Sequence, residues 1–137
     1  MTIFVDTSAF HAFVDEDDAD HEAVSRAWDS LWQAGATLLT TNYVVTETIA
    51  LMQNRLGLAA VRAFVDGMIP VLRVEWVEPE SHEAATEALL AANRRELSLV
   101  DCTSFVTMRR LGLRQALTLD AHFSEQGFEC LPAPVRP

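Results

Sequence analysis

Short runs rich in β-branched and aromatic residues alternate along the chain with longer segments in which apolar residues recur every three or four positions. The short runs predict strands at residues 2–5, 36–40, 71–77, 116–119 and 128–131. The longer segments predict helices at residues 7–14, 20–33, 41–57, 58–68, 79–95 and 98–112, with a short helix around His122. The tail at residues 132–137 is expected to end the fold.

Strands that alternate with helices are typical of an α/β fold, because a short apolar strand needs a helix on each face of the sheet to be buried. We therefore expect a mainly parallel sheet with helices on both sides, in a three-layer α/β/α arrangement. The 137 residues suit one domain around one core. No repeat or linker interrupts them.

Composition narrows the classes of function. No apolar run approaches the roughly 20 residues of a membrane span, and the N-terminal segment lacks the basic region of a signal peptide. These features predict a cytoplasmic protein without membrane contact. Cys102 and Cys130 form neither a CxxC pair nor a zinc-type spacing with histidine, so we expect buried, reduced thiols.

The charge is strongly acidic, with a formal net value of -10, ten arginines and no lysine. A protein coated with basic surface is excluded, because nonspecific nucleic-acid affinity comes largely from neutralised phosphates. Half of the arginines gather in the second half of the chain. They could form a local rim that binds RNA, or a solvated helix face with cations near a helix C-terminus, and the sequence leaves both readings open. These residues are Arg94, Arg95, Arg109, Arg110 and Arg114.

Three aspartates occupy the ends of predicted strands or the start of a predicted helix. Asp6 ends the first strand, Asp120 follows the strand at 116–119, and Asp101 lies in the first turn of the helix at 98–112. Ligands of open parallel sheets bind beyond the carboxyl ends of the strands, so these carboxylates can converge there. Taken singly, each could instead cap a helix.

Glu47 is harder to explain as a structural residue. Its neighbours one turn away are Tyr43, Val44, Ala50 and Leu51, none of them basic, and burying an unpaired charge costs several kcal/mol. Like charges about 4 Å apart repel by about 4 kcal/mol, against about 0.3 to 1 kcal/mol for a helix-dipole contact. Capping alone would not hold such a group together, whereas Mg²⁺ or Mn²⁺ would, because both prefer oxygen ligands. The prediction is a hard-metal site that hydrolyses phosphodiesters.

Four segments resemble the signature motifs of the PIN-domain family, and of VapC-type toxins in particular. They are VDTSAF with Asp6, TTNYVVTETIA with Glu47, LSLVDCTSFVTMRRLG with Asp101 and ALTLDAHFSEQGFECL with Asp120. The resemblance spans nearly the whole chain in the family's order and spacing. It implies a single PIN domain over residues 1–137, with a parallel sheet of about five strands.

The resemblance also implies a function. It is that of an Mg²⁺- or Mn²⁺-dependent endoribonuclease that cleaves structured RNA, acts as a homodimer and is neutralised by a VapB-like antitoxin. Asp6, Glu47 and Asp101 would form the catalytic acidic core, and Asp120 would complete the metal site. Four hydroxyl side chains are expected to support these acids: those of Thr7, Ser8, Ser104 and Thr118. They could instead form the ordinary hydrogen bonds of helix starts and strand ends.

Two alternatives stay open within the family: a catalytically silent module that binds RNA or protein, and a nuclease of RNA processing without an antitoxin. A phosphoacceptor receiver is excluded, since it needs a lysine, and so is a haloacid-dehalogenase-type enzyme, since Ser8 stands where it needs a second aspartate.

The four histidines are given no role. Trp28, Trp32 and Trp76 are expected in the core or in dimer contacts.

Overall fold

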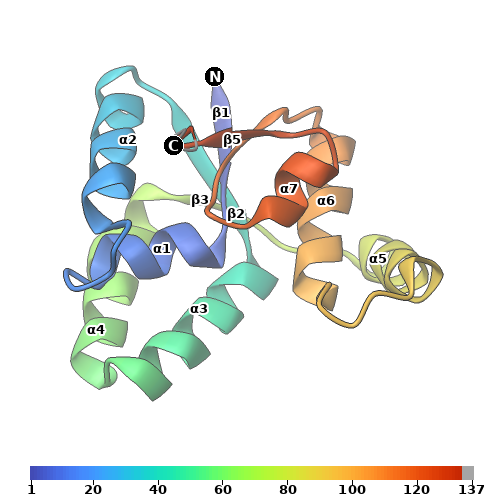
Figure 1. Ribbon diagram of the computed structural model, residues 1–137, viewed down its shortest axis with the longest axis horizontal. Helices are drawn as coiled ribbons and strands as arrows, with labels where there is room; N and C mark the ends of the chain where they lie inside the picture. Colours follow the sequence, from blue (N-terminus) through green and yellow to red (C-terminus); the bar gives the residue numbers. More distant parts are fainter. Residues whose placement is uncertain (134–137) are drawn as a thin grey trace.

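A parallel β-sheet lies at the centre of the computed structural model, which describes residues 1–133 (Figure 1). In sequence order its strands are β1 (Thr2–Val5), β2 (Thr37–Thr41), β3 (Arg73–Glu75), β4 (Gln115–Leu117) and β5 (Glu129–Leu131). Across the sheet the order is β3-β2-β1-β4-β5, and each neighbouring pair is parallel. The winding direction reverses at β1. The carboxyl ends of β1 and β4 therefore border the switch point at which sheets of this kind bind ligands.

Helices fill the connections and cover the sheet. They are α1 (Thr7–Val14) and α2 (His21–Gln33) before β2, α3 (Asn42–Arg55) and α4 (Leu58–Ala63) before β3, α5 (Pro79–Ala92) and α6 (Leu99–Leu111) before β4, and α7 (Ala121–Glu125) before β5. Figure 1 shows α1 to α4 on one side of the sheet and α5 to α7 on the other. Right-handed crossovers require this arrangement when the winding direction reverses. The predicted three-layer α/β fold with a five-stranded parallel sheet is confirmed.

The helix boundaries follow from residues that the sequence marks. The side chain of Thr41 accepts a hydrogen bond from the backbone N–H of Val44 at 3.1 Å and caps α3. Ser98 and Asp101 form a capping box at the start of α6, with bonds of 3.0 and 3.2 Å between side chains and backbone. α6 ends at Gly112, whose φ of 71° is a left-handed conformation that glycine adopts at little cost.

One predicted strand is much shorter in the structure. Of residues 71–77 only the three residues of β3 pair in the sheet. The preceding chain forms a 3-10 turn at Ile69–Val71, which follows a π-helical turn at Phe64–Met68. Beyond β3, the backbone N–H of Val77 donates to the side chain of Asn42 at 2.7 Å instead of to a neighbouring strand. The predicted strand was too long because neither event has a local sequence signal.

The helix predicted at residues 79–95 ends early as well. It stops at Ala92, because Asn93 adopts a left-handed conformation with φ of 51°, which asparagine tolerates better than most residues. Of the predicted tail, residues 134–137 lie outside the described part of the chain. Within residues 1–133, no helix is both long and apolar enough to cross a membrane.

Aromatic side chains fill the core on both faces of the sheet. On one face Phe10 packs against Trp28 and Phe64, with ring centroids 6.4 and 5.1 Å away. On the other face Phe105 and Phe123 meet edge to face at 5.0 Å. The core therefore has two aromatic halves, one on each side of β1.

The tryptophans and cysteines divide between core and surface. Trp28 is buried as expected, whereas Trp32 and Trp76 are 53% and 68% exposed and are not core residues. Cys102 is buried and Cys130 half-buried, and neither forms a disulfide. Of the two expected buried positions, only that of Cys102 is fully buried.

Replacing Phe10 by alanine should lower the free energy of unfolding by about 3 to 5 kcal/mol, because it removes a fully buried ring and leaves a cavity beside Trp28 and Phe64. Urea unfolding measures this change. Leu90→Ala is the matched control, since Leu90 is 73% exposed and its truncation should change stability by less than about 0.5 kcal/mol. Equal losses in the two variants would contradict the role given to Phe10.

Candidate functional site

Asp6 lies where β1 and β4 meet. Its backbone N–H donates to the carbonyl of Leu117 at 3.1 Å, which continues the parallel pairing beyond the last residue of β1. The residue is only 4% exposed. Its carboxylate oxygen Oδ2 accepts hydrogen bonds from the hydroxyls of Ser8 and Thr118, each at 3.0 Å. Ser8 and Thr118, which are 110 positions apart in the chain, thus hold one carboxylate oxygen.

Ser8 and Thr118 are themselves held by the backbone after β4. The Ser8 hydroxyl accepts from the N–H of Leu119 at 2.9 Å, and the Thr118 hydroxyl accepts from the N–H of Asp120 at 3.0 Å. Each hydroxyl has one proton, and both protons are directed to Asp6. The 3.3 Å approach of the two hydroxyl oxygens is then a contact, not a further bond. This network locks the start of α1 to the loop that carries Asp120.

Burial and like charge raise the pKa of two acids of this crevice, Asp6 and Asp101. The pKa of Asp6 rises to about 6, mainly because burial disfavours the charged form and further because of the negative charge of Asp101. Hydrogen bonds from Ser8 and Thr118 oppose the rise. The pKa of Asp101 is also raised, first by burial and then by the charge of Asp120, against the stabilising bond from the Ser98 backbone.

Asp101, Asp120 and His122 form the tightest group in the crevice. Each offers one ligand atom, and these atoms lie within 4.8 Å of one another. His122 Nδ1 lies 3.0 Å from Asp120 Oδ1 and 3.8 Å from Asp101 Oδ2. The angles do not suit a hydrogen bond, so this buried nitrogen has no hydrogen-bond partner within residues 1–133. An orphaned nitrogen between two carboxylates fits a divalent cation.

Glu47 lies at the margin of this group. It is half-buried on α3 and shares a surface pocket with Tyr43, Thr46 and Val100, the residue before Asp101. It belongs to no cluster of ligand atoms within 4.8 Å, and it forms no ion pair in the described part of the chain. The structure therefore brings Glu47 beside the residue that precedes Asp101, but it does not place the two carboxylates in one cluster.

Only two of the four predicted supporting hydroxyls bond to an acid of the site. Ser8 and Thr118 do so, as described. The hydroxyl of Thr7 accepts from Thr48 at 3.2 Å, although the backbone of Thr7 helps to lower the pKa of Asp6. The hydroxyl of Ser104 donates to the carbonyl of Val100 at 3.0 Å, a bond within α6. The contacts of Ser104 therefore favour a structural role within α6 over support of the acids.

The five arginines predicted as a possible RNA rim do not form one surface at the site. Arg94 lies near it and binds Glu125 of α7 and Glu96, each at 2.9 Å, and Arg95 is exposed beside it. Arg109 and Arg110 lie eight and nine residues after Asp101 on α6, about 12 Å along the helix axis. Arg110 pairs with Glu75 at 3.2 Å, Arg109 covers the ring of Phe128 at 5.2 Å, and Arg114 precedes β4 at the end opposite Asp120.

Sequence reasoning missed His122, which it gave no role. The available signal was its position two residues after Asp120, in the first turn of a short helix. There the backbone N–H of His122 donates to Asp120 Oδ1 at 2.9 Å, so the cap folds the imidazole back toward the carboxylate that receives the bond. A histidine at that spacing from a strand-end aspartate is a candidate for the same site.

The fold and the acidic crevice together define the class of protein. The model of the PIN domain family matches residues 3–129, and the chain belongs to this family. The family predicted from the four sequence motifs is thus confirmed.

Two curated relatives and two solved structures specify the resemblance further. The chain is 40% identical over 127 residues to the 23S rRNA-specific endonuclease VapC20 of Mycobacterium tuberculosis, covering 92% of this chain and 95% of the relative. It is 32% identical to the ribonuclease VapC26 of that organism, over 89% and 90% of the two chains. The crystal structure of VapC20, a sarcin-ricin loop cleaving toxin, matches with a TM-score of 0.80 at 39% identity, over 98% and 99% of the chains. VapBC2 from Rickettsia felis, at 10% identity over 95% and 97%, shares the fold with a TM-score of 0.71.

Metal-free protein should lose stability as the pH rises from about 4 to about 6, because the folded chain still holds the Asp6 proton where the unfolded chain, with a pKa of 3.8, has released it. Asp6→Asn lacks this titration. Its stability relative to the wild type should increase by about 2 to 3 kcal/mol over this range and then level off. Urea unfolding of both proteins in EDTA, at a series of pH values, gives this difference. A difference independent of pH would contradict a raised pKa at Asp6.

Proposed function

We propose that this chain is a metal-dependent endoribonuclease, the toxin of a VapBC-type toxin–antitoxin pair. One observation carries the proposal: near the switch point of a PIN-type sheet, Asp6, Asp101 and Asp120 lie close enough that the charge of Asp101 raises the pKa of Asp6 and the charge of Asp120 raises the pKa of Asp101. Ordinary helix capping does not require such crowding of like charges. A site for a cation and a phosphodiester does.

Mg²⁺ or Mn²⁺ is the cofactor that we propose. The carboxylates of Asp6, Glu47, Asp101 and Asp120 would hold it, with the orphaned ring nitrogen of His122 beside them. When bound, such an ion lowers the pKa of the attacking water and stabilises negative charge on the phosphate. Burial is the main reason that the pKa of Asp6 and of Asp101 is raised, and binding would also offset the repulsion that adds to it.

The chain's own residues prepare this site before any ligand arrives. Ser8 and Thr118 direct both hydroxyl protons to one oxygen of Asp6, which orients the carboxylate and leaves the other oxygen without a side-chain hydrogen bond within residues 1–133. The capping box with Ser98 does the same for Asp101. Since these bonds fix the carboxylates, they need little reorganisation during the reaction.

The proposed substrate is structured ribosomal RNA, as for the 40% identical relative named a 23S rRNA-specific endonuclease. The chain's net charge of -10 disfavours attraction of RNA over its whole surface. Arg94 and Arg95, beside the site, are the candidates for local phosphate contacts, and the positions of Arg109, Arg110 and Arg114 favour them less. Recognition of a folded RNA shape, which needs few charge contacts, suits this surface.

Several further properties complete the proposal. We propose a single PIN domain over the whole chain, a homodimer, a cytoplasmic location and neutralisation by a VapB-like antitoxin. The match to VapC proteins over nearly their full lengths supports the antitoxin. A silent PIN module that only binds RNA or protein, and a processing nuclease without an antitoxin, are the alternatives.

Asp101→Asn should lower RNA cleavage by more than about a hundredfold and weaken Mn²⁺ binding, while the fold is retained. The assay maps cuts in 23S rRNA by primer extension, with and without EDTA, and calorimetry follows Mn²⁺ binding. Asp29→Asn, an equal change of charge at an exposed position on α2, is the control. A wild type that binds Mn²⁺ and 23S rRNA without cutting it would favour the silent module, and one that does not bind Mn²⁺ would refute the metal site.

Ser8→Ala should lower cleavage by about 10- to 100-fold, because the variant loses one of the two hydroxyls that orient Asp6. Ser104→Ala is the matched control. Its hydroxyl bonds only to the carbonyl of Val100 within residues 1–133, so its removal should leave cleavage unchanged. Equal losses in the two variants would show that Ser8 does not act through Asp6. Initial rates at saturating Mn²⁺ make the comparison.

A further inference from the structure

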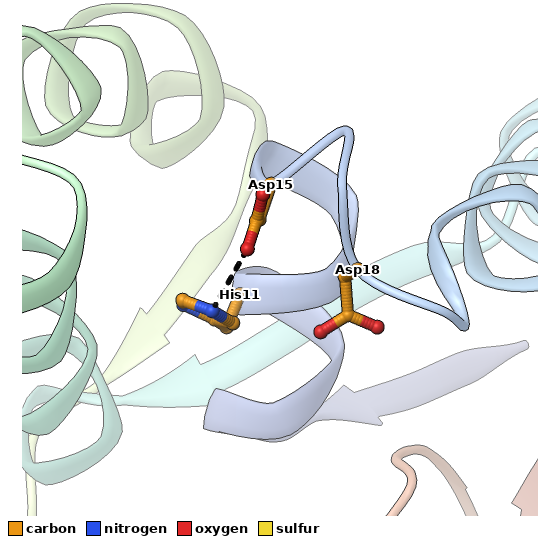
Figure 2. Close-up of side chains that lie close together, drawn as sticks. All are labelled: His11, Asp15 and Asp18. Atoms are coloured by element: carbon orange, nitrogen blue, oxygen red, sulfur yellow. Dashed lines mark ion pairs between the residues drawn. The ribbon is translucent and has the colours of Figure 1, made fainter.

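A second group of metal-ligand side chains lies at the other end of α1 from Asp6. His11, Asp15 and Asp18 each offer one ligand atom, and these atoms lie within 4.8 Å of one another (Figure 2). Asp15 follows Asp6 by nine residues, which corresponds to about 13 Å along the helix axis. The group is therefore separate from the crevice at the switch point and takes no part in the function proposed above.

His11 is a buried side chain without a hydrogen bond. The residue is 9% exposed, and its Nδ1 atom is buried with no partner among residues 1–133. Its Nε2 atom faces Asp15 Oδ2 at 3.5 Å, as the dashed line in Figure 2 marks, but the two atoms form no hydrogen bond. Neither ring nitrogen of His11 therefore forms a hydrogen bond within residues 1–133, and Nε2, the one that faces Asp15, is available to a ligand.

The 3.5 Å separation suits two ligands of one ion. With metal–ligand bonds of about 2.0 to 2.1 Å and tetrahedral angles, two donor atoms on the same ion lie roughly 3.3 Å apart. A direct hydrogen bond between imidazole and carboxylate would instead be about 2.7 to 2.9 Å long. The spacing of His11 and Asp15 is thus closer to that of a shared ion than to that of a direct bond.

The two carboxylates are oriented by the loop that carries them. Asp15 Oδ1 accepts from the backbone N–H of Asp17 at 3.1 Å, and Asp18 Oδ1 accepts from that of Asp20 at 2.8 Å. In the described part of the chain, Oδ2 of each residue accepts no hydrogen bond. One oxygen of each carboxylate therefore remains for a ligand, and the other keeps the side chain in place.

The surrounding charge favours a cation. Acidic residues occupy five of the six positions 15–20, and the first arginine of the chain is Arg26. Within residues 1–133 none of these acids pairs with an arginine. One imidazole with two carboxylates is a donor set for first-row transition metals such as Zn²⁺, which bind nitrogen ligands more readily than Mg²⁺ does.

We propose that His11, Asp15 and Asp18 bind a divalent transition-metal ion that ties the end of α1 to the loop before α2. The ion is structural: it joins a helix to a loop that otherwise carries only like charges, and water completes its coordination. Binding of this kind stabilises the folded chain, because the unfolded chain has no preformed site.

Calorimetric titration with Zn²⁺ tests the proposal on the whole protein. His11→Asn and Asp18→Asn should each lose one equivalent of bound Zn²⁺ relative to the wild type. The side-chain amide introduced by Asp18→Asn would keep the oxygen that accepts the Asp20 N–H, so this substitution removes charge and a ligand without removing the turn. Asp17→Asn makes the same change of charge in the same loop at an exposed side chain outside the group, and it should bind as much Zn²⁺ as the wild type.

Two results would overturn the proposal. In the first, the wild type and the three variants bind the same number of Zn²⁺ ions. In the second, Asp17→Asn and Asp18→Asn lose equal amounts of bound Zn²⁺, which would indicate diffuse attraction of the cation by the acidic loop. Circular dichroism checks folding, and if His11→Asn does not fold, the pair Asp17→Asn and Asp18→Asn decides. Asp101→Asn should keep the Zn²⁺ equivalent that depends on Asp18. This result separates the present proposal from that of the nuclease site.

Discussion

The functional crevice depends on the parallel pairing of β1 with β4. This pairing joins the two halves of the chain at the switch point, and it sets Asp6 beside Thr118 although more than a hundred residues separate them. The same contact buries the carboxylate of Asp6 and so raises its pKa. One interaction therefore sets both the position of Asp6 and its raised pKa, because the strand pairing that places the carboxylate also excludes water from it.

The elements were predictable where the signal is local. The run 2–5 before Asp6, the capping box of Ser98 and Asp101, and the glycine after α6 depend on contacts within a few residues, and each appears in the structure as predicted. The general rule for parallel sheets then indicated the edge at which the acids would meet. The short β3 was not predictable, since its limits depend on a bond between Val77 and the distant Asn42.

Side-chain partners were less predictable than elements, because they depend on the direction in which each side chain points. Ser8 and Ser104 look alike in sequence, each close to a strand-end or helix-start aspartate. The first reaches Asp6 across the β1–β4 junction, while the second bonds inside its own helix. His122 was missed for the converse reason, since its approach to Asp101 appears only when α6 and α7 are packed. The positions of the arginines also depend on the fold, since Arg109 and Arg110 lie in the last turn of α6, whereas Asp101 lies in its first turn.

The effect of the acidic net charge on RNA binding depends on where the charged side chains lie. Two arginines of the second half of the chain are paired with surface acids, Arg94 with Glu125 and Arg110 with Glu75, which leaves their charge less available to phosphates. The carboxylates, by contrast, gather at two ends of α1 and repel one another in the absence of a cation. A divalent ion in such a cluster both offsets the repulsion and presents positive charge where the polypeptide has none. For an acidic nuclease, the attraction of RNA would then be concentrated at the site of cleavage, and binding elsewhere on the surface would be disfavoured.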